Sequence, residues 1–269
     1  MGCWQAAGWA TSDDDRFVGT IQHGLDLGLN FLDTAVGYGR GHSEELVGKA
    51  IAGRREQVVI ATKFSHPSSR PDDVVRACDE ALVRLGTDYI DLFQQHWPPP
   101  DIPLADTIGA LERLKEQGKI RAVGVSNWME PEWDEIDDPS RVDCLQPNYS
   151  LLWREAALAV VPAAKKKGMG IVSGSPLQQG WLSQRYDDVV RDAPPPWLSP
   201  ARREQILKLY ALVDELGMPL PELALRFVLS NKNVNVALSG MSDMRMLEEN
   251  VATADAAGEL SEKDFRRIE

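Results

Sequence analysis

Val58-Val-Ile-Ala-Thr-Lys63 is a short apolar run that ends on a charged residue, and this pattern decides the fold class. Asn30-Phe-Leu-Asp33 ends on an acid in the same way, and Tyr89-Ile-Asp-Leu-Phe-Gln-Gln-His96 ends on a histidine. Short, nearly all-apolar runs are typical of parallel strands that are buried on both faces. Amphipathic segments of helical period separate these runs, so the sequence predicts an α/β protein.

Strand-like and helical segments alternate from one end of the chain to the other, without a linker that would divide it. Such repetition predicts a (β/α)8 TIM barrel, formed as a single domain by residues 1–269, rather than an open sheet. The expected strands are Met1–Trp4, Asn30–Asp33, Val58–Thr62, Tyr89–Gln95, Ala122–Ser126, Cys144–Pro147, Gly170–Ser175 and Asn233–Leu238. The expected helices include Asp13–Leu27, Ser43–Ala52, Pro71–Leu85, Leu104–Gln117, Ala156–Lys167 and Ala201–Leu216.

Composition excludes several classes of protein. The chain has 43% hydrophobic residues and no apolar run long enough to cross a bilayer, and its first residues do not resemble a secretory signal. Three cysteines without CxxC spacing indicate a reducing cytoplasm and no bound metal. A net charge of −12 argues against nucleic acid as a partner, because phosphate backbones select basic surfaces. We therefore expect a cytoplasmic protein that acts on small molecules, away from membranes, and whose oligomeric state is open.

Four residues suggest the chemistry. Side chains at the carboxyl ends of barrel strands converge on one mouth, so Asp33, Lys63 and His96 should meet there, together with Tyr38 from the first loop. An ammonium beside a phenol stabilises the phenolate and lowers the phenol pKa. Asp33 would keep Lys63 protonated, and a neutral His96 would orient a carbonyl group. This set predicts protonation of a carbonyl oxygen while hydride arrives at the carbon.

Each of these residues also has a simpler interpretation, which for Tyr38 is ordinary packing. An aspartate at the end of a strand is often a helix cap, and a histidine before Trp97-Pro-Pro-Pro can be an ordinary rim residue. Lys63 alone is compatible with a Schiff-base lysine of a barrel aldolase. The chain has no G-x-G-x-x-G after a strand, so a Rossmann site is not indicated. The coincidence of four such residues on one rim favours the proton-donating site.

The four residues lie in longer strings that resemble the aldo-keto reductase family. The matching strings cover nearly the whole chain, in order. They are Gly28-Leu-Asn-Phe-Leu-Asp-Thr-Ala-Val-Gly-Tyr-Gly39, Gly41-His-Ser-Glu-Glu-Leu-Val-Gly48, Val59-Ile-Ala-Thr-Lys63, Leu111-Glu-Arg-Leu-Lys-Glu-Gln-Gly-Lys-Ile-Arg-Ala-Val-Gly-Val-Ser-Asn127, Gln146-Pro-Asn-Tyr-Ser-Leu-Leu152, Ser175-Pro-Leu177 and Glu248-Glu-Asn250.

This resemblance implies a (β/α)8 barrel that reduces aldehydes or ketones with a nicotinamide cofactor bound across the barrel mouth. Tyr38 would be the general acid, tuned by Lys63 and Asp33, and His96 would orient the carbonyl. The resemblance further implies that Ser126, Asn127 and Gln146 bind the nicotinamide carboxamide, that Ser175 and Leu177 contact the pyrophosphate, and that Glu249 and Asn250 contact the adenine.

Two positions near the expected cofactor depart from the family pattern. Gly174 stands where many members have an aromatic residue that stacks on the nicotinamide. The segment that should bind the 2′-phosphate of NADP has Arg245 one residue out of register, although Ser242 at a helix start could add donors. Asp243 would repel a phosphate. On the resemblance we expect NADP(H) rather than NAD(H).

The chain starts inside the first expected strand, at Met1-Gly-Cys-Trp, whereas family members usually begin with a β-hairpin that closes the barrel bottom. We therefore expect a barrel that lacks this hairpin and has an exposed apolar floor, which favours self-association. The alternative is a start that has been misplaced or trimmed.

The function predicted from the sequence is reversible reduction of a carbonyl compound to an alcohol. A redox-sensing or regulatory protein with the same fold and cofactor but slow turnover is the alternative, and a Schiff-base aldolase that uses Lys63 is a third. Aldoses, small aldehydes and aromatic ketones all fit the predicted site.

Overall fold

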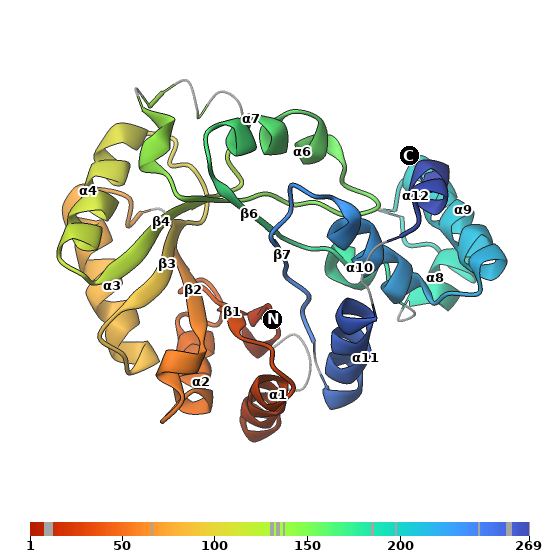
Figure 1. The fold of residues 1–269 in the computed structure, drawn as a ribbon, viewed down its shortest axis with the longest axis horizontal. Helices are drawn as coiled ribbons and strands as arrows, with labels where there is room; N and C mark the ends of the chain where they lie inside the picture. Colours follow the sequence, from red (N-terminus) through yellow and green to blue (C-terminus); the bar gives the residue numbers. More distant parts are fainter. Residues whose placement is uncertain are drawn as a thin grey trace.

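The computed structural model describes residues 1–7, 13–65, 67–129, 132, 135–136, 138–183, 186–196, 198–241, 243–256 and 260–268. Within these residues, seven parallel strands pair in the order β1-β2-β3-β4-β5-β6-β7. They are β1 Phe31–Asp33, β2 Val59–Phe64, β3 Ile90–Gln95, β4 Ile120–Ser126, β5 Cys144–Gln146, β6 Gly170–Ser173 and β7 Val236–Ala237. The strands lie at the centre and the helices surround them (Figure 1).

The N-terminal segment closes the sheet. Gly2 forms parallel bridges to Asp33 on one side and to Gly240 on the other. Its backbone N–H donates to the carbonyl of Ser239 at 2.9 Å, and the N–H of Cys3 donates to the carbonyl of Asp33 at 2.8 Å. The expected barrel is therefore present. The expected strand Met1–Trp4 is wrong in extent, because the chain turns into the 3₁₀ helix η1 Trp4–Ala7 directly after the bridge.

Five of the helices, α1 Asp14–Asp26, α2 His42–Ala50, α3 Pro71–Leu85, α4 Leu104–Glu116 and α9 Pro200–Leu216, lie close to their expected positions. The others are α6 Glu155–Leu158, α7 Val160–Lys166, α8 Asp187–Asp192, α10 Leu220–Ser230, α11 Met244–Asp255 and α12 Glu262–Ile268. The helix α3 shows why they form. Pro71 occupies its first turn, Gly86 caps it at φ 63°, and Val74, Cys78, Ala81 and Leu85 form its buried stripe.

One expected helix is interrupted. The segment predicted as Ala156–Lys167 forms two helices, α6 and α7, with Ala159 between them at φ −121° and ψ −65°. Pro162 explains the break, because a proline ring collides with the carbonyl of the residue four positions earlier, which is Leu158.

Among the described residues, no helix is long and apolar enough to span a membrane.

Alternation along the strands divides the barrel interior into layers. Ala61, Leu92, Cys144, Val172 and Leu238 form an apolar cluster, and the partly buried Phe31, Ala122 and Val236 pack against it. Val59, which pairs in register with Phe31 at the start of β2, is 36% exposed. Two positions beyond Ala61, Leu92 and Cys144 lie the polar residues Lys63, Gln94 and Gln146, which belong to the upper layer and to the candidate site.

A buried ion pair anchors α2 beneath the loop that carries Tyr38. The Arg84 Nε lies 2.6 Å from Glu44 Oε2, and the hydroxyl of Thr62 donates to Glu44 Oε1 at 2.6 Å. The Glu44 side chain is fully buried, and that of Arg84 is 19% exposed. Gly41 allows this contact, because a Cβ there would lie 2.6 Å from Arg84 Cδ.

The first prediction concerns this ion pair. Arg84→Met leaves the Glu44 carboxylate buried without its cation, so we expect the free energy of unfolding to fall by about 3 kcal/mol. Arg76→Met is the control, because Arg76 forms an exposed i,i+3 pair with Asp73 and its loss should change stability by less than about 1 kcal/mol. Urea denaturation measures both. Equal effects of the two substitutions would contradict the prediction.

Candidate active site

The structure brings Asp33, Lys63 and Tyr38 into contact at the carboxyl ends of β1 and β2. Lys63 Nζ lies 2.6 Å from Asp33 Oδ1, 2.9 Å from the carbonyl oxygen of Thr34 and 3.4 Å from Tyr38 Oη. The side chains of Lys63 and Asp33 are only 2% and 5% exposed. Asp33 pairs in register with Ala61, and therefore Lys63 lies two residues further along β2 on the same inner face.

The ion pair determines the charge of the lysine. Burial of Lys63 works against its charge, but Asp33 and then Tyr38 outweigh this effect and hold the pKa of the ammonium above its usual value. An amine that stays protonated cannot attack a carbonyl carbon. The geometry therefore argues against the Schiff-base aldolase that the sequence left open.

Tyr38 remains a neutral phenol. Burial raises its pKa above the usual value, and the Lys63 ammonium, which favours the phenolate, offsets this effect only in part. Lys63 does lower the pKa of Tyr38, as expected, but burial outweighs this effect and the net shift of the pKa is upward. A phenol with a raised pKa carries its proton throughout the neutral range and can therefore act as a donor.

His96 faces the same space. Its ring meets the ring of Tyr38 edge-on, with centroids 5.7 Å apart, and stacks against the exposed Trp97 at 6.2 Å. Burial, assisted by the charge of Lys63, lowers the pKa of His96 to about 3. The imidazole is thus neutral at neutral pH and retains one N–H donor.

Hydrogen bonds among Thr34 directly after β1, the N-terminal segment and the start of α2 hold the loop that carries Tyr38. The hydroxyl of Thr34 donates to Ser43 Oγ at 2.8 Å, and Ser43 Oγ donates to the carbonyl of Cys3 at 2.9 Å. At the end of the loop, the N–H of Ser43 donates to the carbonyl of Tyr38 at 3.2 Å. The N-terminal segment and the start of α2 therefore fix the phenol relative to the barrel.

Two buried amides surround the other oxygen of Asp33. Gln146 Nε2 lies 3.2 Å from Asp33 Oδ2, and Gln94 Nε2 lies 3.5 Å from the same atom and 3.4 Å from Gln146 Oε1. Gln94 escaped the sequence analysis. Its position two residues before His96 on a buried strand was the available signal, and the facing Gly124 leaves it space, since a Cβ there would lie 2.6 Å from Gln94 Cγ.

The expected carboxamide-binding residues Ser126, Asn127 and Gln146 join this network. Ser126 Oγ donates to the carbonyl of Gln146 at 3.1 Å. Asn127 has a left-handed backbone with φ 60°, and its Nδ2 donates to the carbonyl of His96 at 2.9 Å and to Ser126 Oγ at 3.1 Å. Strained non-glycine residues are often found at functional sites.

The other expected cofactor residues form separate groups. Ser175 follows β6 with φ 52°, and Leu177 packs partly buried against the C-terminal core. Ser242 lies outside the described residues. The helix α11 begins after Asp243, which is its N-cap and accepts from the N–H of Met246 at 2.9 Å. A carboxylate therefore occupies the helix start at which Ser242 was expected.

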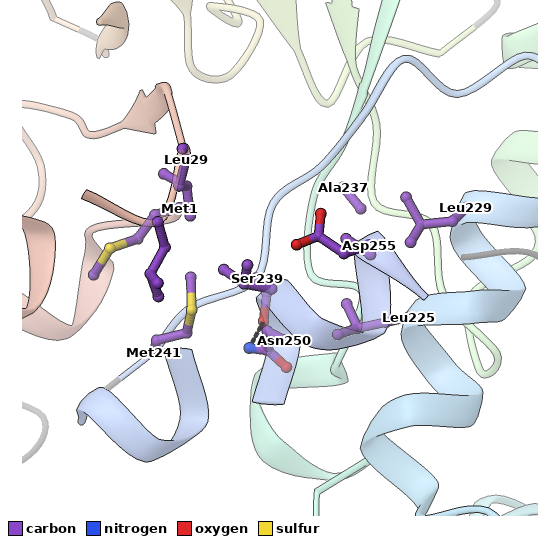
Figure 2. A pocket seen from close by; sticks show the side chains of 13 residues that line it. Met1, Leu29, Leu225, Leu229, Ala237, Ser239, Met241, Asn250 and Asp255 are labelled. Carbon is purple, nitrogen blue, oxygen red and sulfur yellow. Dashed lines mark hydrogen bonds between the residues drawn. The ribbon is translucent and has the colours of Figure 1, made fainter. Parts of the chain in front are cut away.

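On α11, Arg245 and Glu249 face solvent and Asn250 faces inward. The Arg245 side chain is 77% exposed and lies 3.8 Å from Glu249. Asn250 Nδ2 donates to Ser239 Oγ at 3.1 Å, at the wall of a cavity of about 250 Å³ between α10, α11 and Met1 (Figure 2). This cavity is lined mostly by apolar side chains, and none of the four proposed catalytic residues lines it.

Comparisons with known proteins agree with this geometry. Residues 1–269 match the model of the aldo/keto reductase family. The chain is 35% identical to aldo-keto reductase YhdN of Bacillus subtilis, over 92% of this chain and 82% of that protein. It is 31% identical to the NADH-specific methylglyoxal reductase of Escherichia coli, over 94% of this chain and 88% of that protein. An aldo/keto reductase of Klebsiella pneumoniae, solved with NADP and acetate, superposes with a TM-score of 0.84 at 27% identity, covering 100% of this chain and 88% of that one.

The second prediction concerns the protonation of His96. The folded-state pKa of about 3 lies below the ordinary 6.5, so between these pH values His96 is protonated in the unfolded chain and neutral in the folded chain. Stability should therefore fall as the pH drops from 6.5 towards 3, by about 2 kcal/mol between pH 6.5 and about pH 4.5. His96→Gln removes this contribution.

The difference in unfolding free energy between wild type and His96→Gln, measured by urea denaturation across this pH range, isolates the histidine from the carboxylates that titrate in both. A difference that does not change with pH would show that His96 titrates normally.

Proposed function

Because this chain belongs to the aldo/keto reductase family of NAD(P)(H)-dependent oxidoreductases, we propose that it reversibly reduces an aldehyde or ketone to an alcohol, with Tyr38 as the general acid. The observation that carries the proposal is the 3.4 Å contact between Lys63 Nζ and Tyr38 Oη. A buried ammonium beside a phenol favours the phenolate that forms when the proton leaves, at the moment when negative charge develops on a carbonyl oxygen.

The residues divide the work of proton delivery. Tyr38 gives its proton to the carbonyl oxygen, and the charge of Lys63 stabilises the phenolate left behind. Asp33 keeps Lys63 charged and in place through the 2.6 Å pair. His96 is neutral and donates its remaining N–H to the same oxygen, which positions the carbonyl group against Tyr38. A bound nicotinamide supplies the hydride to the carbonyl carbon.

The amide cluster beside these residues suits a nicotinamide. Ser126, Asn127 and Gln146 end β4 and β5 next to His96, and hydroxyl and amide groups match the donors and acceptors of a carboxamide. The amide of Gln94, buried beside them, has an oxygen that finds no hydrogen-bond partner within the described residues. We assign the nicotinamide end of the cofactor to this cluster, and the pyrophosphate to the loop of Ser175 and Leu177.

For the substrate, we propose a small or flat carbonyl compound. Trp97 is exposed and stacks on the imidazole of His96, so it offers an apolar wall beside the carbonyl-orienting group. The similar protein of Escherichia coli reduces methylglyoxal, as its name states, which supports a small aldehyde. A panel of methylglyoxal, an aldose and acetophenone, followed by the absorbance of the reduced nicotinamide, tests this proposal.

The third prediction concerns Tyr38. Tyr38→Phe keeps the ring but removes the proton, and we expect the rate of the chemical step to fall by about 10²- to 10⁴-fold with little change in cofactor affinity. Single-turnover kinetics and calorimetric titration with NADPH and NADH measure the two quantities. Tyr89→Phe, at the opposite end of β3, is the control and should leave the rate unchanged. Wild type that binds cofactor without hydride transfer would refute the enzymatic proposal.

The residues on α11 that we expected to bind the 2′-phosphate of NADP offer little positive charge to it. Asp243 places a carboxylate at the start of α11, where it would repel the 2′-phosphate. Arg245 is exposed to solvent and already forms an ion pair with Glu249. We therefore propose that the enzyme uses NADP(H) with only a modest preference over NAD(H), and that Asp243 limits this preference.

The fourth prediction tests this account of cofactor preference. Asp243→Asn keeps an oxygen that can cap α11 while it removes the charge, so we expect the preference for NADPH over NADH to rise about threefold to tenfold in kcat/KM. Arg245→Ala should lower the preference. If neither substitution changes the ratio, the 2′-phosphate is recognised elsewhere.

A further inference from the structure

Asn148 is a residue to which neither the sequence nor the proposed reaction gives a role. It lies two residues beyond Gln146, at the point where β5 ends, and its backbone forms a parallel bridge with Gly174 after β6. The N–H of Gly174 donates to the carbonyl of Pro147 at 2.8 Å, and the N–H of Tyr149 donates to the carbonyl of Gly174 at 3.1 Å. These bonds fix the backbone of Asn148 on both sides.

The side chain of Asn148 is linked to the active site by a hydrogen bond to Asn127. Asn148 Nδ2 donates to Asn127 Oδ1 at 3.0 Å. The amide nitrogen of Asn127 in turn donates to the carbonyl of His96 at 2.9 Å and to Ser126 Oγ at 3.1 Å. The chain of contacts thus runs from Asn148 through one amide to the backbone of the histidine.

This chain determines which way the amide of Asn127 faces. Both hydrogens of its Nδ2 are directed at oxygens, and its Oδ1 faces the donor on Asn148. Ser126 Oγ already gives its own hydrogen to the carbonyl of Gln146, so a rotated Asn127 would place oxygen against oxygen. Asn148 supplies the matching donor, and one lone pair of Asn127 Oδ1 remains available.

Gly174 makes room for this arrangement. A Cβ at position 174 would lie 3.2 Å from Asn148 Oδ1 and 3.4 Å from the carbonyl oxygen of Pro147, so any side chain there would press on the Asn148 amide. Position 174 is therefore coupled to Asn148. The backbone of Gly174 does not have a positive φ, so an alanine could adopt its conformation.

We propose that Asn148 is a positioning residue of the active site: it holds the amide of Asn127 in the orientation that presents an acceptor to the nicotinamide carboxamide, and through Asn127 it steadies the His96 backbone. This inference rests on the proposed function, because it assigns the carboxamide to this cluster. Asn148 itself touches neither the substrate nor the reacting atoms.

The first test removes the donor. Asn148→Ala should weaken binding of NADPH and NADH about fivefold to tenfold in calorimetric titration, because one oriented hydrogen bond is lost. Asn30→Ala, on an exposed residue at the opposite end of β1, is the control and should leave affinity unchanged. Unchanged affinity in Asn148→Ala, with wild-type melting temperature, overturns the proposal. Because this readout needs no turnover, it is independent of whether the wild type reduces carbonyl compounds.

The second test separates orientation from simple packing. Asn148→Asp places an acceptor against Asn127 Oδ1, so affinity should fall further than in Asn148→Ala at pH 8. As the pH falls towards about 5, the introduced carboxyl begins to gain a proton that it can donate, and the ratio to wild type should recover. Asn30→Asp should give a flat ratio. A flat ratio for Asn148→Asp would show that Asn148 acts only as packing.

The third test uses the coupling to Gly174. Gly174→Ala should weaken cofactor binding by a smaller factor, because its Cβ displaces the Asn148 amide by only a few tenths of an ångström. In the double variant Asn148→Ala/Gly174→Ala this loss should disappear, since the side chain it acts on is gone. Full additivity of the two losses would show that Gly174 acts independently, and would refute the coupling.

Discussion

The buried pair between Lys63 and Asp33 is the constraint on which the upper layer of the barrel depends. Two charges removed from water carry a large desolvation cost, which only close contact and further hydrogen bonds can offset. The barrel supplies both. Lys63 Nζ reaches Asp33 at 2.6 Å and the carbonyl of Thr34 at 2.9 Å, while the second carboxylate oxygen accepts from Gln146 at 3.2 Å. The donor side chains of Lys63 and Gln146 come from β2 and β5, so the site depends on the closed sheet that brings these strands to Asp33.

Burial next to this ion pair also sets the protonation states of His96 and Tyr38. Burial, assisted by the cation of Lys63, lowers the pKa of His96 and keeps its imidazole neutral, and burial raises the pKa of Tyr38 and keeps its phenol protonated. Both groups are therefore hydrogen-bond donors at the pH of a cell. A site with a cation and two neutral donors, and with its one anion fully engaged, is suited to an oxygen that gains negative charge. The same arrangement leaves no unprotonated amine, so covalent chemistry on the lysine is disfavoured.

Sequence reasoning predicted the features that local chemistry determines. Apolar runs that end on Asp33, Lys63 and His96 gave the strands and their convergence, because parallel barrel strands place such ends on one rim. The features it missed depend on contacts between distant segments. Gln94 was overlooked because its role comes from the facing Gly124 and from Asp33, neither of which is near in sequence. The helix break at Ala159, by contrast, could have been predicted from Pro162. At the start of α11 the sequence offers two neighbouring capping residues, Ser242 and Asp243, and the structure uses Asp243 as the N-cap.

The net charge of the chain bears on the kind of contact that could hold the proposed cofactor. With a net charge of −12, the protein's long-range field repels an anionic dinucleotide. Such a field is screened within about 10 Å at moderate salt, whereas hydrogen bonds act at contact and survive screening. The proposed binding of such a cofactor would therefore depend on short-range groups whose orientation is determined in advance. Asn127, which we propose as a contact of the cofactor, is oriented in this way: its backbone is left-handed, and three hydrogen bonds, to the carbonyl of His96, to Ser126 and from Asn148, define its side chain.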